Sequence, residues 1–184
     1  MPERYPTIVV LGLSPTGLYT VRELSRAGFS VLGVADQPAC GVSSRYLTHP
    51  KRSWLIHDDE LLVKRLCLLA QEEDQRPILL PTSDRYIEFV ADYYTDLNEH
   101  FFLQPSYSPD YVYDLLEKGR FYKLCAQHGL DAPGIWYPDT KAELLGLVDQ
   151  LPYPCILKPK LIHLAATYLK GRKVLLANNR AEYE

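Results

Sequence analysis

Short apolar runs alternate with helical patterns through the first hundred residues, and this alternation constrains the fold more than any other feature. Residues 7–11 form a β-branched apolar run, residues 15–27 repeat apolar side chains at helical spacing, and residues 29–34 form a second apolar run. This order predicts a β-α-β unit with parallel strands and a right-handed crossover.

The same alternation continues up to Pro105. Further elements are predicted as strands at residues 54–56, 77–80 and 101–103, and as helices at residues 58–70 and from Thr82 to about Leu97. Strands that alternate with helices form an open, mainly parallel sheet covered on both faces. Ligands meet such sheets just beyond the carboxyl ends of the strands, which here are residues 12–17, Asp36 and residues 81–84.

After Pro105 the pattern changes, and we predict a domain boundary there, with domains at residues 1–105 and 106–184. The second domain is expected to contain helices near residues 108–116, 121–129 and 141–149, and strands near residues 135–137, 155–158 and 174–177.

Composition excludes several classes of protein. With 184 residues, 47% of them hydrophobic and 23% charged, the chain has an ordinary soluble composition. A net charge of -3 argues against general nucleic-acid binding, and no apolar run has the length of a membrane span. The four cysteines are far apart without zinc-like spacing, and the five histidines have no partner spacing typical of a hydrolase. We therefore expect a cytoplasmic protein that binds neither nucleic acid nor a membrane.

A basic segment near the C-terminus points to an anionic ligand. Lys158 ends the short apolar run of YPCILKPK, and no acidic residue occurs between Asp149 and Glu182, although six lysines and arginines do. Uncompensated positive charge beside a strand suits a polyphosphate. A solvated basic surface is the alternative.

The sequence GLSPTG, residues 12–17, lies between a predicted strand and a helix, and invites comparison with a dinucleotide-binding turn. Ser14 replaces the middle glycine of that motif and Pro15 removes an amide donor, while Leu18 follows where a Walker A loop has lysine. A tight β-α turn is the alternative. Asp84 is either an acid that faces a ligand or an ordinary first-turn helix acid.

The order of motifs in the second domain carries a family resemblance. Lys118 precedes an aromatic helix, Gly129 and Pro133 follow, and a strand and a helix lead to the apolar strand that ends in LKP. In this order the chain resembles the N-terminal part of an ATP-grasp carboxylate-amine ligase, most closely the branch of D-aspartate ligase and the carbamoyl-phosphate synthase large subunit. GLSPTGLYTVRELSRAGFSVLGVAD and ILLPTSDRYIEF resemble the pre-ATP-grasp domain, and EKGRFYKLCAQHGLDAP through PCILKPK resembles the start of the nucleotide-binding domain.

The resemblance implies an α/β fold, with a Rossmann-like mainly parallel sheet followed by a linker helix and a partial α+β subdomain. It places Lys118 near the adenine and ribose of ATP and Lys158 at the α-phosphate, and it assigns Ser14 and Asp84 to the substrate side. The family's glycine-rich loop is missing, because the first glycine after Lys158 is Gly171. A different lid is therefore implied, and it would use Lys170 or Lys173.

The implied complete enzyme uses ATP and Mg²⁺ to join a small carboxylate to an amine or ammonia through an acyl phosphate, and it allows a homo-oligomer. The family holds its magnesium on acidic and amide side chains further downstream, whereas only Glu182 and Glu184 are acidic after Lys158. We therefore expect a fragment without catalytic or metal-binding residues that is inactive alone. A non-catalytic Rossmann-like nucleotide-binding or interaction module is the alternative hypothesis, and an NAD-dependent oxidoreductase is a third.

Overall fold

The chain divides into two compact units, Met1–Ala132 and Pro133–Glu184, which we call unit 1 and unit 2. The computed structural model describes residues 5–158, 172 and 174–184, without the side chain of Lys118. The domain boundary after residue 105 was derived from a change of sequence pattern and stays a prediction. Within the described residues, no helix combines the length and the hydropathy needed to cross a membrane.

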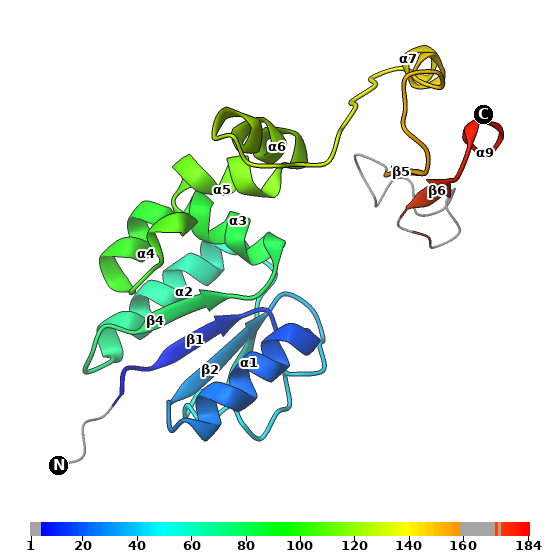
Figure 1. Ribbon diagram of the computed structural model, residues 1–184. Helices are drawn as coiled ribbons and strands as arrows, with labels where there is room; N and C mark the ends of the chain where they lie inside the picture. The colour runs from blue at the N-terminus through cyan, green and yellow to red at the C-terminus, as the bar shows by residue number, and fades with distance from the viewer. Residues whose placement is uncertain (1–4, 159–171, 173) are drawn as a thin grey trace. The chain divides into compact units, whose positions relative to one another are not determined.

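Unit 1 is built on a four-stranded parallel sheet (Figure 1). Its strands are β1 (Ile8–Leu11), β2 (Val31–Ala35), β3 (Ser53–Leu55) and β4 (Ile78–Pro81), in the spatial order β3-β2-β1-β4. The chain first moves outward from β1 to β3 and then returns to the other side of β1 for β4. This reversal makes the boundary between β1 and β4 the switch point of the sheet, where α/β proteins bind ligands.

Helices follow the strands in the order predicted. They are α1 (Pro15–Arg26), α2 (Asp59–Glu72), α3 (Asp84–Asp92), α4 (Tyr94–His100), α5 (Pro109–Leu116) and α6 (Lys118–Gln127), with a 3₁₀ turn at Pro105–Tyr107. Helix α1 has proline at its first position, and α2 is capped by Asp58, whose carboxylate accepts from the Leu61 N–H at 2.7 Å. These local signals determine where the helices begin.

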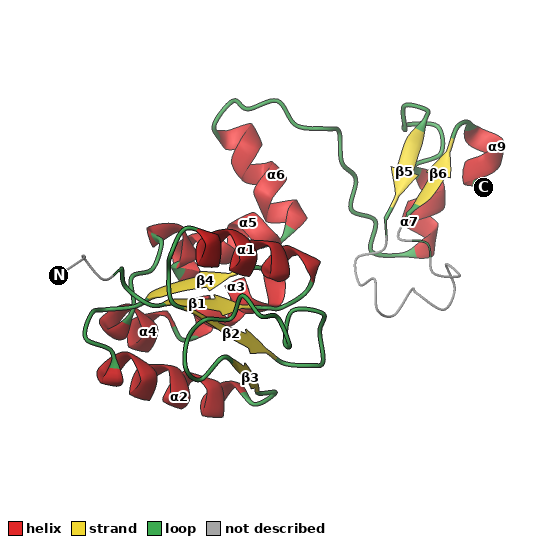
Figure 2. Cartoon of the chain, turned by 90° about the horizontal axis from the view of Figure 1, so that it is seen from below, coloured by secondary structure: helices red, strands yellow, loops and turns green. Residues whose placement is uncertain are grey.

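The sheet is covered on both faces, as the alternation predicted (Figure 2). On one face Ile8 and Val10 of β1 pack with Val21 of α1, and on the other Val9 and Leu11 pack with α2 and α3. All five side chains are at most 2% exposed. Burying an aliphatic side chain of this size contributes about 1.5–3 kcal/mol, so both layers stabilise the sheet.

Two predicted elements of unit 1 are wrong in detail. The helix predicted from Thr82 to Leu97 is two helices, because Tyr93 leaves helical geometry with φ -109° and ψ 24°. The strand predicted at residues 101–103 is a single parallel bridge between Phe102 and Ile78. Pairing ends there because Pro105, which has no N–H to donate, begins the 3₁₀ turn shortly afterwards.

Unit 2 contains α7 (Lys141–Gly146), the antiparallel strands β5 (Cys155–Leu157) and β6 (Leu175–Ala177), and α9 (Arg180–Tyr183). This mixture agrees with the α+β subdomain predicted for this region. The strand predicted at residues 135–137 is absent: these residues are exposed, and no strand among the described residues pairs with them. Helix α7 ends earlier than predicted, at Gly146, because glycine is a poor helix former.

A buried polar network holds the amino-terminal edge of the sheet in unit 1. The Thr7 hydroxyl donates to one oxygen of Glu73, and His49 Nε2 lies 3.1 Å from the other. The Lys51 N–H donates to His49 Nδ1 at 3.1 Å, so in the neutral ring Nε2 carries the hydrogen and donates to Glu73. The His49 side chain is only 7% exposed, so this network ties the loop before β3 to the end of α2.

We expect Glu73→Ala to lower the free energy of unfolding by about 2–3 kcal/mol, because it leaves the buried His49 and Thr7 donors without an acceptor. Glu72→Ala is the matched control. Glu72 pairs with Lys51, and both side chains are well exposed, so its loss should cost less than about 1 kcal/mol. Urea unfolding curves measure both values. Equal effects of the two substitutions would contradict the role given to the network.

Candidate functional site

Two of the predicted site residues lie at one edge of the sheet. Leu11 at the end of β1 is in register with Pro81 at the end of β4, and Ser14 and Asp84 each follow three residues later. Ser14 is the N-cap of α1 and Asp84 is the first residue of α3, and both side chains are exposed. The structure therefore brings Ser14 and Asp84 together at the switch point.

Helices α1 and α3 both begin at this edge. The N-terminal N–H groups and the dipole of a helix favour a negatively charged ligand. Ser14 does not use its side chain to cap α1, and Ser83, the N-cap of α3, does not use its side chain to cap α3. The edge therefore offers hydroxyl groups and backbone donors next to the acidic Asp84.

The glycines of residues 12–17 are required by packing inside the chain. Gly12 has φ +94°, and a Cβ on it would lie 2.8 Å from Thr82 Oγ1. A Cβ on Gly17 would lie 1.8 Å from the Gly12 carbonyl oxygen. Thr82 Oγ1 lies 2.9 Å from the carbonyl oxygens of both Leu11 and Gly12, which fastens the turn to β4. This geometry accounts for both glycines as parts of a tight β-α turn.

Tyr86 is a residue of this edge that the sequence analysis missed. It lies on α3 with 3% of its surface exposed, and its ring would be 3.2 Å from a Cβ on Gly12. Its buried hydroxyl has no hydrogen-bond partner at normal distance within the described part of the chain, and only a weaker interaction with the Asp36 backbone N–H. Burial raises the pKa of the Tyr86 hydroxyl well above its ordinary value, and the negative charge of Asp36, just after β2, raises it further.

Removing this hydroxyl should stabilise the protein. We expect Tyr86→Phe to raise the free energy of unfolding at neutral pH by about 1 kcal/mol, because a buried unsatisfied hydroxyl is costly. The raised pKa adds a second effect. Above the unfolded pKa of about 10, Tyr86 ionises in the unfolded chain but not in the folded one, so the wild-type protein loses stability as pH rises toward the folded pKa. The advantage of Tyr86→Phe should therefore grow above pH 10.

Chemical unfolding at pH 7 and at about pH 10.5 measures this difference. Tyr19→Phe is the matched control, since Tyr19 lies on the surface with 66% exposure and should show neither effect. A Tyr86→Phe variant that is less stable than wild type at both pH values would mean that the hydroxyl has a stabilising partner.

The predicted nucleotide-binding lysines are in different units. Lys118 is the first residue of α6 in unit 1, where Glu117 caps the helix by accepting from the Gly119 N–H at 3.1 Å. Lys158 directly follows β5 in unit 2 and is exposed, and no described carboxylate pairs with it. The Lys118 side chain, Lys170 and Lys173 lie outside what the structure describes.

Not all of the basic residues near Lys158 are uncompensated. Arg180 pairs with Asp149 at 2.5 Å and with Glu184 at 2.8 Å, so its charge is balanced inside unit 2. In the described part of this segment, the basic side chains without an acidic partner are therefore Lys158 and Arg172. Among the described residues, no three His, Cys, Asp or Glu side chains come together as a metal site.

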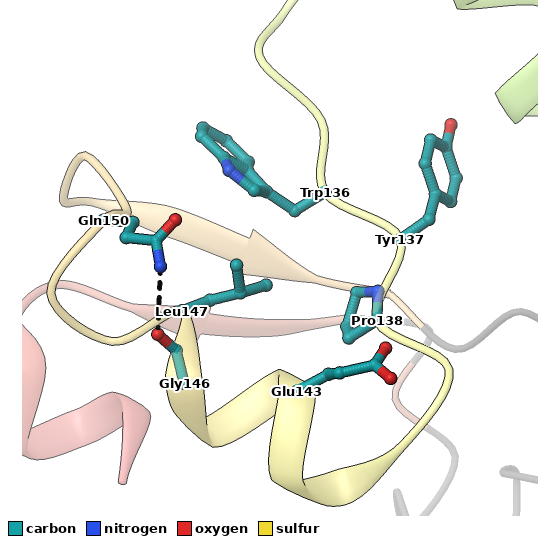
Figure 3. A pocket seen from close by; sticks show the side chains of 7 residues that line it. All are labelled: Trp136, Tyr137, Pro138, Glu143, Gly146, Leu147 and Gln150. Atoms are coloured by element: carbon teal, nitrogen blue, oxygen red, sulfur yellow. Dashed lines mark hydrogen bonds between the residues drawn. The ribbon is translucent and has the colours of Figure 1, made fainter.

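Unit 2 also has a hollow of about 390 Å³ between the segment before α7 and the helix itself (Figure 3). Trp136 and Leu147 provide apolar surface, and Gln150 donates to the Gly146 carbonyl at 3.3 Å. The Glu143 carboxylate accepts from the Asp139 N–H at 2.8 Å and so belongs to the cap of α7. The hollow offers an aromatic surface rather than a charged site.

Comparison with known proteins finds similarity to solved structures but not to known sequences. No family model matches the chain, and no curated protein matches its sequence. An L-amino acid ligase from Bacillus licheniformis has a TM-score of 0.60 at 15% identity, over 98% of this chain and 41% of the ligase. An N5-carboxyaminoimidazole synthase from Aspergillus clavatus, in complex with ADP and 5-aminoimidazole ribonucleotide, has a TM-score of 0.61 at 20% identity, over 98% and 42%.

The biotin carboxylase domain of 2-oxoglutarate carboxylase from Hydrogenobacter thermophilus, in complex with MgADP, has a TM-score of 0.62 at 15% identity. The match covers 98% of this chain and 39% of that domain. These likenesses show that the chain has the fold of ATP-grasp carboxylate-amine ligases and carboxylases over nearly its whole length, which confirms the predicted resemblance at the level of fold. The chain spans about two fifths of each of these structures.

Proposed function

We propose that this chain is the N-terminal portion of an ATP-dependent carboxylate-amine ligase of the D-aspartate ligase and carbamoyl-phosphate synthase type. The observation that carries the proposal is the position of Lys158. It is an exposed lysine directly after an apolar strand, with no described acidic partner, in a chain whose fold is that of enzymes solved with ADP. A lysine in this position can neutralise a phosphate as a point charge.

In the complete enzyme, ATP would transfer its γ-phosphoryl group to a small carboxylate, and ADP would leave. An amine or ammonia would then attack the acyl phosphate, form the amide bond and release inorganic phosphate. Mg²⁺ and cationic side chains stabilise the negative charge of the transferring group in such reactions. The metal ligands would come from further downstream, and this part of the chain would supply nucleotide and substrate contacts.

Each predicted residue has one role in this scheme. Lys158 would contact the α-phosphate, Lys118 would lie on the adenine and ribose side, and Lys170 or Lys173 would belong to the lid. Ser14 and Asp84 would hold the substrate at the carboxyl edge of the sheet, where the two helices α1 and α3 begin. The scheme also includes a domain boundary after residue 105, a cytoplasmic location and assembly as a homo-oligomer.

Lys158→Ala tests the proposal in the longest natural chain that contains these residues. We expect kcat/KM for ATP to fall at least about tenfold, mainly through a higher KM, in an assay of ADP release with candidate carboxylates and amines. The α-phosphate is not the transferred group, and hydrogen bonds to charged groups contribute about 1.5–3 kcal/mol to binding. Lys141→Ala is the matched control, because Lys141 is also an exposed lysine of unit 2 but begins α7. Its activity should stay at the wild-type level.

The same assay separates the alternatives. Nucleotide binding without ADP release under any substrate pair would favour a non-catalytic nucleotide-binding module. Thermal stabilisation by NAD(H) and not by ATP would favour the oxidoreductase. Activity that is equal in wild type and Lys158→Ala would contradict the role given to this lysine.

A further inference from the structure

A second basic feature lies in unit 1, on the face of the sheet that α1 covers. Helix α1 and the loop after β2 border an open surface hollow of about 540 Å³, and its arginine side chains are exposed. Its charged and polar lining consists of Arg22, Arg26, Ser43, Ser44, Arg45 and Tyr46. We call these six residues the arginine groove.

The guanidinium groups of the groove are arranged around one aromatic ring. Arg26 lies 5.4 Å from the centre of the Tyr46 ring and Arg45 lies 5.1 Å from it, distances typical of cation-π contacts. Arg45 also donates to the Tyr46 hydroxyl at 3.2 Å. Arg22 is one helical turn before Arg26, so it projects from the same side of α1. Tyr46 thus positions two of the three arginines.

The loop that carries Tyr46 is fastened to the sheet. The Gly41 N–H donates to the Leu13 carbonyl at 3.0 Å, and Ser53 donates from its hydroxyl to the Val42 carbonyl at 3.0 Å. Arg52 donates to the Ser44 carbonyl at 3.0 Å. Because these bonds hold the loop from both sides, a ligand in the groove would meet side chains on an ordered backbone.

The charges of the groove do not cancel. Glu23 pairs with Arg26 at 2.5 Å, and no other described carboxylate pairs with Arg22, Arg26 or Arg45. Three guanidinium groups against one carboxylate leave a net charge of two positive units. Arginine side chains present paired N–H donors that match the oxygens of a phosphoryl group. The Ser43 and Ser44 side chains add hydroxyl groups to the same lining.

We propose that the arginine groove binds the dianionic phosphoryl group of a small phosphate monoester. The groove belongs to unit 1, whereas the proposed nucleotide contact at Lys158 belongs to unit 2. Its residues also differ from Ser14 and Asp84, which lie where α1 and α3 begin. The net charge of the arginine groove, two positive units, balances the two negative charges of a phosphoryl dianion. The side chains of the groove also carry more hydrogen-bond donors than acceptors. The inference does not depend on the proposed ligase activity.

Titration of the 184-residue chain with inorganic phosphate and with AMP tests this site. The ionic strength is held constant, and binding is followed by the NMR chemical shifts of the arginine Nε–H groups. We expect saturable shifts at Arg22, Arg26 and Arg45. The double variant Arg22→Gln/Arg45→Gln should raise both dissociation constants at least about tenfold, because it removes two charged hydrogen-bond donors from the groove. Tighter binding of AMP than of phosphate would identify a nucleotide as the source of the group.

Two controls make the result specific. Arg65→Gln removes an exposed arginine from α2, on the other face of the sheet, and should leave both dissociation constants unchanged. Lys158→Ala should also leave phosphate binding in the groove intact. Sulfate at the same ionic strength should compete, and chloride should not.

The titration of Tyr46 gives an independent readout. Arg45 and Arg26 lower the pKa of the Tyr46 hydroxyl by donating hydrogen bonds to it and by their positive charge. A bound phosphate would neutralise these charges, so the Tyr46 pKa should rise on binding. The difference in tyrosinate absorbance between wild type and Tyr46→Phe measures this pKa. Binding that is unchanged in the double variant, or shifts that never saturate, would overturn the proposal.

Discussion

Gly17→Ala should destabilise unit 1 by more than about 4 kcal/mol, which is a large part of the roughly 5–15 kcal/mol that stabilises an ordinary domain. A Cβ at this position would lie 1.8 Å from the Gly12 carbonyl oxygen and 3.0 Å from Thr82 Oγ1. The backbone at Gly12 cannot move aside without further losses, because its N–H donates to the Val34 carbonyl at 2.8 Å and its carbonyl oxygen lies against Thr82. Helix α1 would have to move away from the sheet.

The fluorescence of Trp54, which packs against the core of unit 1, reports this unfolding in a background where Trp136 is replaced by phenylalanine. Gly146→Ala is the matched control, and the fluorescence of Trp136 in its own unit reports its stability in a background where Trp54 is replaced by phenylalanine. The Gly146→Ala control makes the same chemical change at the end of α7, where a new Cβ has nothing within 4 Å. The control should change stability by no more than about 1 kcal/mol. A Gly17→Ala variant with wild-type stability would show that the turn can relax without cost.

The second large effect concerns ATP. We expect Mg-ATP to change the melting temperature of residues 1–184 by less than about 1 °C, whereas a longer chain at one hundred times its dissociation constant should gain about 2.7 kcal/mol. The described residues offer no metal site, and the chain spans about two fifths of the structures that it resembles. Without a metal, Lys158 and a few basic neighbours would have to balance a triphosphate.

Ordering those basic side chains around the nucleotide costs conformational entropy that so few contacts do not offset. Differential scanning fluorimetry with and without Mg-ATP makes the measurement, and AMP serves as a control for binding at the arginine groove. Submicromolar binding of ATP by the 184 residues, abolished by Lys158→Ala, would show that no further segment is needed.

The parallel sheet could be predicted from the sequence because its two central strands, β1 and β2, are buried on both faces. Strands β1 and β2 are continuous apolar runs with no charged residue, and each is followed by a glycine or an acid at its carboxyl end. The break at Tyr93 could not be predicted, since Phe89, Val90 and Leu97 continue the apolar pattern on both sides of it. Periodicity identifies the buried face of a segment but not a change of helix axis within it.

The residues of the candidate sites also divide into those whose position the sequence predicts and those whose position it does not. Ser14 and Asp84 were predictable, because the carboxyl ends of neighbouring parallel strands must meet. Tyr86 was not, since a tyrosine at an apolar helical position is normally read as core, and only its orphan hydroxyl distinguishes it. The arginine groove joins α1 to a loop about twenty residues later, and each arginine alone is an ordinary surface residue.

The position of β1 between β2 and β4 has a consequence for the chain during its synthesis. Once residue 35 has left the ribosome, β1 can pair with β2. The other edge of β1 stays unpaired until β4 has been synthesised up to Pro81, the register partner of Leu11. At about 5–20 residues per second, the 46 residues from 36 to 81 take roughly 2–9 s to be synthesised. Throughout that time the nascent chain presents an unpaired apolar strand edge, which is a template for pairing with another chain. The strand order therefore opens a period during synthesis in which shielding of this edge by a chaperone would lower the risk of pairing with another chain.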